Sequence, residues 1–155
     1  MNDEKPRFKE IVMPALLRHA RATYGLAMRR ALEEAGFDDI PRNGMYVIGG
    51  LALGAREIPL SRLIQELGVS KQTAGQLVDS LVARGYLERT VNAVDRRKLT
   101  VALTARGEAA AAAQAVARMQ IDAELEARVG AEDIARTRRT LAALRDMGRQ
   151  AEARH

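Results

Sequence analysis

The sequence predicts a mainly helical protein with one small β-hairpin, an α+β class in which helices at both ends flank a central module. Three observations support this class. Alanine supplies much of the 47% hydrophobic content and aromatic residues only 3%, which favours helices over sheets. Apolar residues recur at three- and four-residue spacing in the first and last thirds of the chain. In the middle third, two segments of alternating apolar and polar residues surround a polar turn.

The first third is predicted to be helical, because apolar side chains beginning at Phe8 recur at helical spacing as far as Leu32. Pro14 lies inside this run and predicts either a short lead-in before the main helix or a kink. Gly36 is expected to end the helix. A second helix is predicted to begin at Ile40-Pro41, with proline in its first turn, and to run to about residue 53.

The central residues 60–84 predict two short helices joined by a tight turn. Apolar residues lie on one face of the segment Leu60–Leu67, and Gly68 suits the left-handed conformation that ends a helix. Ser70 is a candidate cap for a second helix over residues 71–84. Two helices with interlocking apolar faces and a glycine turn form a helix-turn-helix arrangement.

The segments 86–91 and 98–103 alternate apolar and polar residues, as half-buried strands do. Between them lies a polar turn with basic residues at its distal end, which predicts a projecting hairpin, here called the wing. A capped helix fits the roughly 12 Å wide major groove of DNA. Guanidinium groups on such a hairpin suit the narrow, electronegative minor groove.

The last third is predicted to form two long helices, the first capped by Thr104 with Glu108 in its first turn. Gly130 ends this helix and the next one follows at once. The second helix has apolar residues at a spacing typical of a short coiled-coil seam. A monomeric helical pair is one interpretation. Two alanine-rich helices with a thin apolar stripe favour a dimer interface instead.

Composition narrows the class of protein. The 155 residues include no cysteine, which excludes disulfides, thiolate metal sites and thiol redox switches. The net charge of +5 favours an anionic partner, although 21 arginines against 4 lysines also fit a codon-biased genome. The charge is uneven: residues 60–107 carry eight basic and four acidic side chains, a net of +4. No segment resembles a membrane span or signal peptide, so we expect a cytoplasmic protein with no membrane partner.

The central residues resemble the MarR family of bacterial transcription regulators. The resemblance rests on residues 63–70, 77–81 and 84–87, and above all on Asp95-Arg-Arg-Lys-Leu-Thr and the residues that follow it to 104. It implies a winged helix-turn-helix domain over 41–104, between dimerisation helices in 1–40 and 105–155. It also implies a homodimer that binds a palindromic operator in double-stranded DNA as a repressor, often released by a small anionic or phenolic ligand.

The resemblance places residues 70–73 and Gln76 at the groove-facing start of the recognition helix, 70–84. Gln72 and Gln76 are expected to read adenine edges, while Ser70, Lys71 and Thr73 hold phosphates or bases. Two positions depart from the family pattern, which more often has a hydroxyl residue at Gly75 and arginine at Gln76. These departures leave the operator sequence open.

The wing, residues 86–103, is expected to bind the minor groove. Arg97 matches the arginine of the family's wing motif and is the candidate for insertion. Asp95 either orients that arginine or holds the turn, and Arg96 and Lys98 are expected to contact phosphates.

Other interpretations stay open. An Asp-Arg-Arg turn by itself is typical of a solvated hairpin, and Arg84 and Arg89 fit ordinary surface charges equally well. A non-specific or architectural DNA-binding protein would use the same basic wing without preferring an operator. An interaction module could also keep the winged fold after losing DNA binding.

Little in the sequence favours an enzyme, because one internal histidine and no cysteine leave a metal site or nucleophilic triad few ligands. We expect no catalysis, metal or cofactor. In the family, the ligand pocket lies where the dimerisation helices meet the winged module, and the candidates there are His19, Tyr24, Met28 and Tyr46. His19 is a candidate titratable anchor for a carboxylate, although a lone histidine on a long helix is more often a surface or interface residue.

Overall fold

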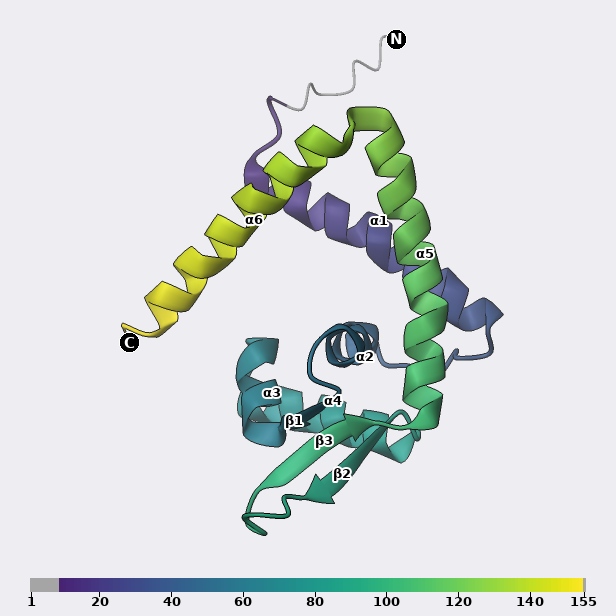
Figure 1. Cartoon of the computed structure of the whole chain (residues 1–155), viewed down its shortest axis with the longest axis vertical. Coiled ribbons are helices and arrows are strands. Elements are labelled where there is room, and N and C mark those ends of the chain that lie inside the picture. Colours follow the sequence, from purple (N-terminus) through teal and green to yellow (C-terminus); the bar gives the residue numbers. More distant parts are fainter. Residues whose placement is uncertain (1–8, 155) are drawn as a thin grey trace. The chain divides into compact units, whose positions relative to one another are not determined.

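The computed structural model describes residues 9–154, so Phe8 and His155 lie outside the described residues (Figure 1). The fold is α+β and mainly helical, as the sequence predicted. The described elements are α1 (Met13–Glu34), α2 (Gly44–Leu53), β1 (Glu57–Pro59), α3 (Leu60–Leu67), α4 (Lys71–Ala83), β2 (Leu87–Val91), β3 (Leu99–Leu103), α5 (Ala105–Val129) and α6 (Ala131–Glu152). They fall into two compact units, one ending at Arg118 and the other beginning at Met119.

Helix α1 begins at Met13 with Pro14 in its first turn, so the described residues 9–12 form a lead-in and the helix follows, the first of the two predicted outcomes. Proline is tolerated there because the first backbone N–H groups of a helix have no partner within it. The helix ends at the expected place, where Gly36 adopts a φ of 87° and the Phe37 amide donates to the Leu32 carbonyl at 2.8 Å.

The predicted start of the second helix is wrong by about three residues, because α2 begins at Gly44. Pro41 lies in a turn before it, in which the Gly44 amide donates to the Pro41 carbonyl at 2.8 Å. Ile40 is 5% exposed and packs into the core ahead of the helix. A side chain at Gly44 would come within 2.9 Å of Ile40 and of Leu81, so the turn fits glycine closely.

The helix-turn-helix prediction is confirmed. Helix α3 ends where Gly68 takes the left-handed conformation, with φ 63°, and α4 begins directly after Ser70. The Ser70 hydroxyl accepts a hydrogen bond from the Thr73 amide at 3.2 Å, which satisfies one of the free N–H groups at the start of α4.

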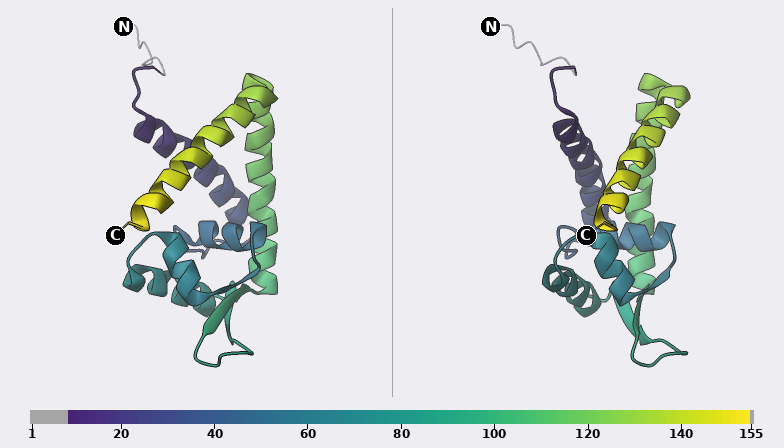
Figure 2. Two further views of the ribbon diagram at one scale, coloured as in Figure 1. Left: turned by 60° about the vertical axis from the view of Figure 1, so that its left-hand side comes forward. Right: turned by 90° about the vertical axis from the view of Figure 1, so that its left-hand side faces the viewer.

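The sheet has a strand that the sequence analysis missed. β2 and β3 form the predicted antiparallel hairpin, and β1 pairs with the other side of β3, giving the order β1-β3-β2. β1 is only three residues long, which is too short for an alternating pattern to be recognised, and it includes Pro59, a residue disfavoured in strands. The hairpin loop projects from the first unit on the side away from α1 and α2 (Figure 2).

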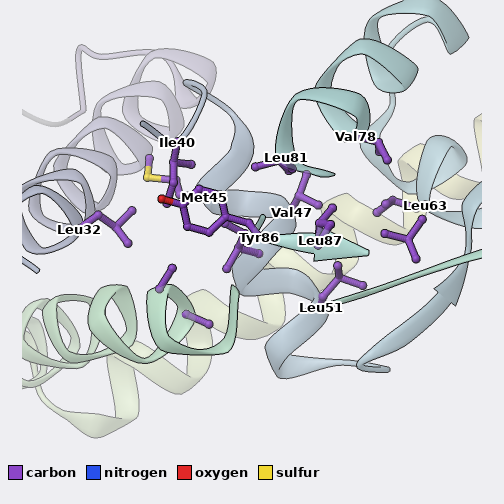
Figure 3. Close-up of a cluster of buried hydrophobic side chains, with 14 of the residues drawn as sticks. Leu32, Ile40, Met45, Val47, Leu51, Leu63, Val78, Leu81, Tyr86 and Leu87 are labelled. Carbon is purple, nitrogen blue, oxygen red and sulfur yellow. The ribbon is translucent and has the colours of Figure 1, made fainter. Parts of the chain in front are cut away.

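The hydrophobic core of the first unit joins the winged module to α1 and to the first turns of α5. Leu32, Ile48, Leu81 and Tyr86 are each 0% exposed. Figure 3 shows several of these buried side chains converging from α1, α2, α4 and β2. Because α4 and β2 are both anchored in this core, helix α4 and the root of the wing rest on one rigid base.

Helices α5 and α6 begin as predicted. The Gly107 amide donates to the Thr104 hydroxyl at 3.1 Å, which caps α5, and Gly130 with φ 88° separates the two helices. Within the second unit, no residue of α6 is buried, and Leu141, Leu144 and Met147 are 40–65% exposed. None of the helices between residues 9 and 154 has the length and apolar character needed to cross a membrane.

Candidate nucleic-acid interface

The start of α4 presents polar side chains to solvent. Ser70 is fully engaged as a cap, since it accepts from the Thr73 amide and donates to the Thr73 hydroxyl at 2.8 Å. Lys71, Gln72 and Gln76 are exposed. The cap fixes the first turn of the helix. The exposed side chains therefore project from a backbone that is held in place.

The wing loop is held by its own side chains. The Asn92 side-chain oxygen accepts from the Val94 amide at 2.8 Å and from the Asp95 amide at 3.1 Å. Asp95 in turn accepts from the Arg97 amide at 3.1 Å. Of the two roles predicted for Asp95, the structure therefore shows that it holds the turn. Hydrogen bonds of this local kind favour a defined turn over an open loop.

Four of the eight basic side chains in residues 60–107 already have a partner, three in ion pairs and one in a hydrogen bond to a backbone carbonyl. Arg62 lies 3.1 Å from Glu66 in an ion pair, and Arg89 pairs with Asp79. Arg84 donates to the Asp39 backbone carbonyl, and Arg106 lies 3.2 Å from the carboxylate of Asp39. Asp79 is therefore the ion-pair partner of Arg89 within the domain.

The other four cations are exposed and have no ion pair or side-chain hydrogen bond with any described residue: Lys71, Arg96, Arg97 and Lys98. One lies at the start of α4 and three lie in the wing loop. Every one of them is a predicted DNA contact. The unpaired basic side chains of the middle third therefore lie at the start of α4 and in the wing loop, the two elements that were predicted to enter the DNA grooves.

One cluster was not found from the sequence. The buried Tyr86 donates its phenolic proton to the Asp39 carboxylate, and Arg106 donates to the Tyr86 hydroxyl at 3.0 Å. The hydrogen bond from Tyr86 holds the pKa of Asp39 below its ordinary value, and burial raises the pKa of Tyr86. Arg106 belongs to this junction between the α1–α2 loop and the start of α5. No local pattern marks a contact between residues so far apart in the chain.

The first unit also has a cleft of about 450 Å³ between α1, α2 and α3. Tyr46 lines it, with the guanidinium of Arg21 4.2 Å from the centre of its ring. Arg62 and Glu66 line it from α3. The sequence analysis did not select Arg21, because nothing in its spacing marks it out among the other charges of α1.

The other three candidate ligand residues do not line this cleft. His19 is exposed on α1, Met28 is 7% exposed in the hydrophobic core, and Tyr24 packs against that core. The structure thus brings Tyr46 together with Arg21, and not with the predicted histidine.

Residues 39–98 match the model of the MarR family. Comparison with solved structures gives FabT from Streptococcus pneumoniae in complex with DNA, with 21% identity, coverage of 89% of this chain and 96% of that chain, and a TM-score of 0.73. A mutant of MarR from E. coli complexed with operator DNA has 21% identity, coverage of 85% and 92%, and a TM-score of 0.67.

A mutant of MepR from S. aureus has 18% identity, coverage of 89% and 98%, and a TM-score of 0.71. At these identities, the three structures show that the chain shares their winged-helix fold. Comparison with curated protein sequences found no match.

Proposed function

We propose, on the premise that this chain belongs to the MarR family through the winged domain at residues 39–98, that it is a homodimeric, sequence-specific repressor of transcription. The observation that carries the proposal is the position of the four unpaired cations. Lys71 lies at the start of the recognition helix, and Arg96, Arg97 and Lys98 lie in the wing loop. Unpaired cations at two projecting elements supply the phosphate attraction on which DNA binding depends.

In this proposal, α4 enters the major groove with its first turns. Gln72 and Gln76 offer the amide pair that recognises adenine N6 and N7. Lys71 and Thr73 bind phosphate, while Ser70 fixes the helix end. Arg97 enters the minor groove, Arg96 and Lys98 contact its phosphates, and Asp95 keeps the loop in shape.

The shared fold supports this placement. FabT from Streptococcus pneumoniae was solved with DNA, and the MarR mutant from E. coli was solved with operator DNA. Both cover more than four fifths of this chain. A regulator of this kind acts in the cytoplasm, where bacterial DNA lies.

We assign the outer regions, residues 1–40 and 105–155, to dimerisation. The apolar side chains of Leu141, Leu144 and Met147 are exposed on α6, and a second copy of the chain would cover them. A two-fold dimer places its recognition helices about 34 Å apart, one turn of DNA, and so selects a palindromic operator. A single monomeric peak on a calibrated sizing column at micromolar concentration would contradict the dimer.

A small anionic or phenolic effector fits the cleft beside α1. Arg21 supplies a cation and Tyr46 an aromatic face and a hydroxyl, while the remaining walls are largely apolar. His19, Tyr24 and Met28 do not line the cleft, so the proposed effector site rests on Arg21 and Tyr46. Benzoate should raise the melting temperature of the protein, and Arg21→Ala should remove that shift.

The test of the main proposal is competition between specific and scrambled DNA. A labelled fragment from upstream of the gene is titrated with the protein at about 150 mM salt, against a competitor of the same length and composition. A regulator should prefer its own site by about 10³-fold or more. Equal affinities for the two duplexes would instead show a non-specific or architectural DNA-binding protein. No binding to either duplex would show that the protein keeps the winged fold without binding DNA.

A further inference from the structure

Three polar side chains, one from each strand of the sheet, meet near the end of the wing strands that leads into the loop. The Thr100 hydroxyl on β3 lies 2.9 Å from a carboxylate oxygen of Glu57 on β1, and 2.5 Å from the Thr90 hydroxyl on β2. Each hydroxyl has one proton to donate. When Thr100 gives its proton to the Glu57 carboxylate, the short contact between the two hydroxyls is a donation from Thr90 to Thr100. The Thr90 hydroxyl also lies 3.4 Å from Glu57, and the Thr100 hydroxyl lies 3.2 Å from the Thr90 backbone carbonyl. Thr100 is only 6% exposed, so its hydroxyl depends on these protein partners.

The cluster lies at the last point where the wing has support from the rest of the sheet. β1 pairs with β3 from Glu57 opposite Ala102 to Pro59 opposite Thr100. Beyond Thr100, the hairpin has only the pair formed by Val91 and Leu99 before the loop begins. A two-stranded hairpin is marginally stable in water. Among the described residues, the hydrogen bonds from Thr100 and Thr90 to Glu57 are thus the last side-chain links between the wing and the body of the domain.

The charge of Glu57 is at odds with a domain that binds DNA. A carboxylate near the DNA repels phosphates and weakens binding. We propose that Glu57 is a positioning residue that holds the wing in the orientation in which Arg97 reaches DNA. The inference rests on the proposed function, because its consequence is measured as DNA affinity.

A matched control lies on the same sheet. Glu88 on β2 is opposite Ala102, the residue that Glu57 faces from the other side, so the two carboxylates flank β3 at one level. The Glu88 side chain is exposed and makes no hydrogen bond or ion pair with a described residue. Glu57→Ala and Glu88→Ala therefore remove the same charge from the same part of the domain, and only the first removes a partner of Thr100.

A pure charge effect and a positioning role for Glu57 predict opposite changes in the DNA affinity of Glu57→Ala. If charge alone matters, both alanine variants bind DNA more tightly. If Glu57 positions the wing, Glu57→Ala weakens binding by about 3- to 10-fold with a shallower salt dependence, while Glu88→Ala binds as well as the unchanged protein or better. Glu57→Gln keeps an acceptor oxygen without the charge, and should bind at least as tightly as the unchanged protein.

The experiment is fluorescence anisotropy with a labelled duplex from upstream of the gene, over a series of salt concentrations. Thr100→Val removes the hydroxyl donor with little change in shape, so it should weaken DNA binding as Glu57→Ala does. If Glu57→Ala fails to fold, Thr100→Val takes its place in the comparison. Tighter binding by Glu57→Ala, equal to that of Glu88→Ala, would overturn the inference.

Hydrogen exchange of the free protein separates this inference from the proposed function. Amides of β2 and β3 near the loop should exchange faster in Glu57→Ala than in Glu88→Ala, whether or not DNA is bound. If the unchanged protein fails to bind any duplex, the proposed function fails and the exchange result still decides whether Glu57 holds the wing. Equal exchange in the two variants would show that it does not.

Discussion

Tyr86 donates its phenolic proton to the carboxylate of Asp39, a residue 47 positions earlier in the chain. This contact joins the loop between α1 and α2 to the residue that precedes β2. Arg106 strengthens it, with its guanidinium 4.7 Å from the centre of the Tyr86 ring and 3.2 Å from Asp39. Three parts of the first unit, including the start of α5, are therefore held at one point.

Removing the phenolic hydroxyl should destabilise the first unit. Tyr86→Phe keeps the buried ring and loses the hydrogen bond to Asp39, so the free energy of unfolding should fall by about 1–2 kcal/mol. Urea denaturation followed by circular dichroism measures the change. Tyr46→Phe is the matched control, because the hydroxyl of Tyr46 makes no hydrogen bond with a described residue. Equal effects in the two variants would rule out a specific role for the contact.

The same contact makes part of the stability depend on pH. The hydrogen bond from Tyr86 lowers the pKa of Asp39 from the ordinary value of 3.8, with Arg106 acting in the same direction and burial opposing them. The folded state therefore binds this proton less readily than the unfolded state. The stabilisation is fully present above the ordinary pKa, and is lost as pH falls through the lowered pKa of the folded protein.

Melting temperatures of the unchanged protein and Asp39→Ala, measured between about pH 7 and pH 3, should show this loss. The gap between the two proteins should be constant near neutral pH and should narrow in acid. A gap that stays constant down to the lowest pH would mean that the charge of Asp39 contributes nothing to stability.

Local signals predicted most of the fold but not the contacts between distant segments. The cap at Ser70 and the turn at Gly68 act within a few residues, so the helix-turn-helix could be found from the sequence. The strand β1 could not, because three residues show no periodicity and their pairing partner lies after the wing loop.

The candidate site divides in the same way. The wing motif around Arg97 is continuous in the chain and was found directly. By contrast, Arg106 counted only as one more positive charge until the fold placed it beside Asp39, 67 positions away in the chain. Burial and pairing, which separate structural arginines from available ones, depend on tertiary structure. The net charge of the middle third therefore did not by itself show which of its eight basic side chains are available to DNA.

Two helical glycines should respond oppositely to alanine. At Gly107, an added Cβ would lie 2.1 Å from the backbone carbonyl oxygen of Tyr86, so Gly107→Ala should destabilise the protein by about 1–3 kcal/mol. Gly75 in α4 has nothing within 4 Å of an added Cβ, so Gly75→Ala should stabilise it by about 0.5–1 kcal/mol. Thermal denaturation of the two variants checks both signs. Stabilisation by Gly107→Ala would mean that α5 does not pack against Tyr86 as described.

Pairing should decide which arginines matter for DNA. Arg97→Ala and Arg89→Ala each remove one positive charge from the wing, so their long-range effects on DNA attraction are similar. The Arg97 side chain has no partner among the described residues, whereas the Arg89 side chain already pairs with Asp79. We expect Arg97→Ala to weaken binding about tenfold and to reduce the salt slope by about one, since it removes a direct contact.

Arg89→Ala should change the affinity by less than about threefold and leave the salt slope unchanged, because an arginine held by a carboxylate releases few counterions when DNA binds. Anisotropy titrations of both variants on one duplex, from about 50 to 200 mM salt, measure affinity and slope together. A larger loss in Arg89→Ala than in Arg97→Ala would place the DNA on the side of the wing strands instead of at the loop. That result would overturn the assignment of Arg97 to the minor groove. Arg89 would then be the residue that contacts DNA, and it would have to leave Asp79 to do so.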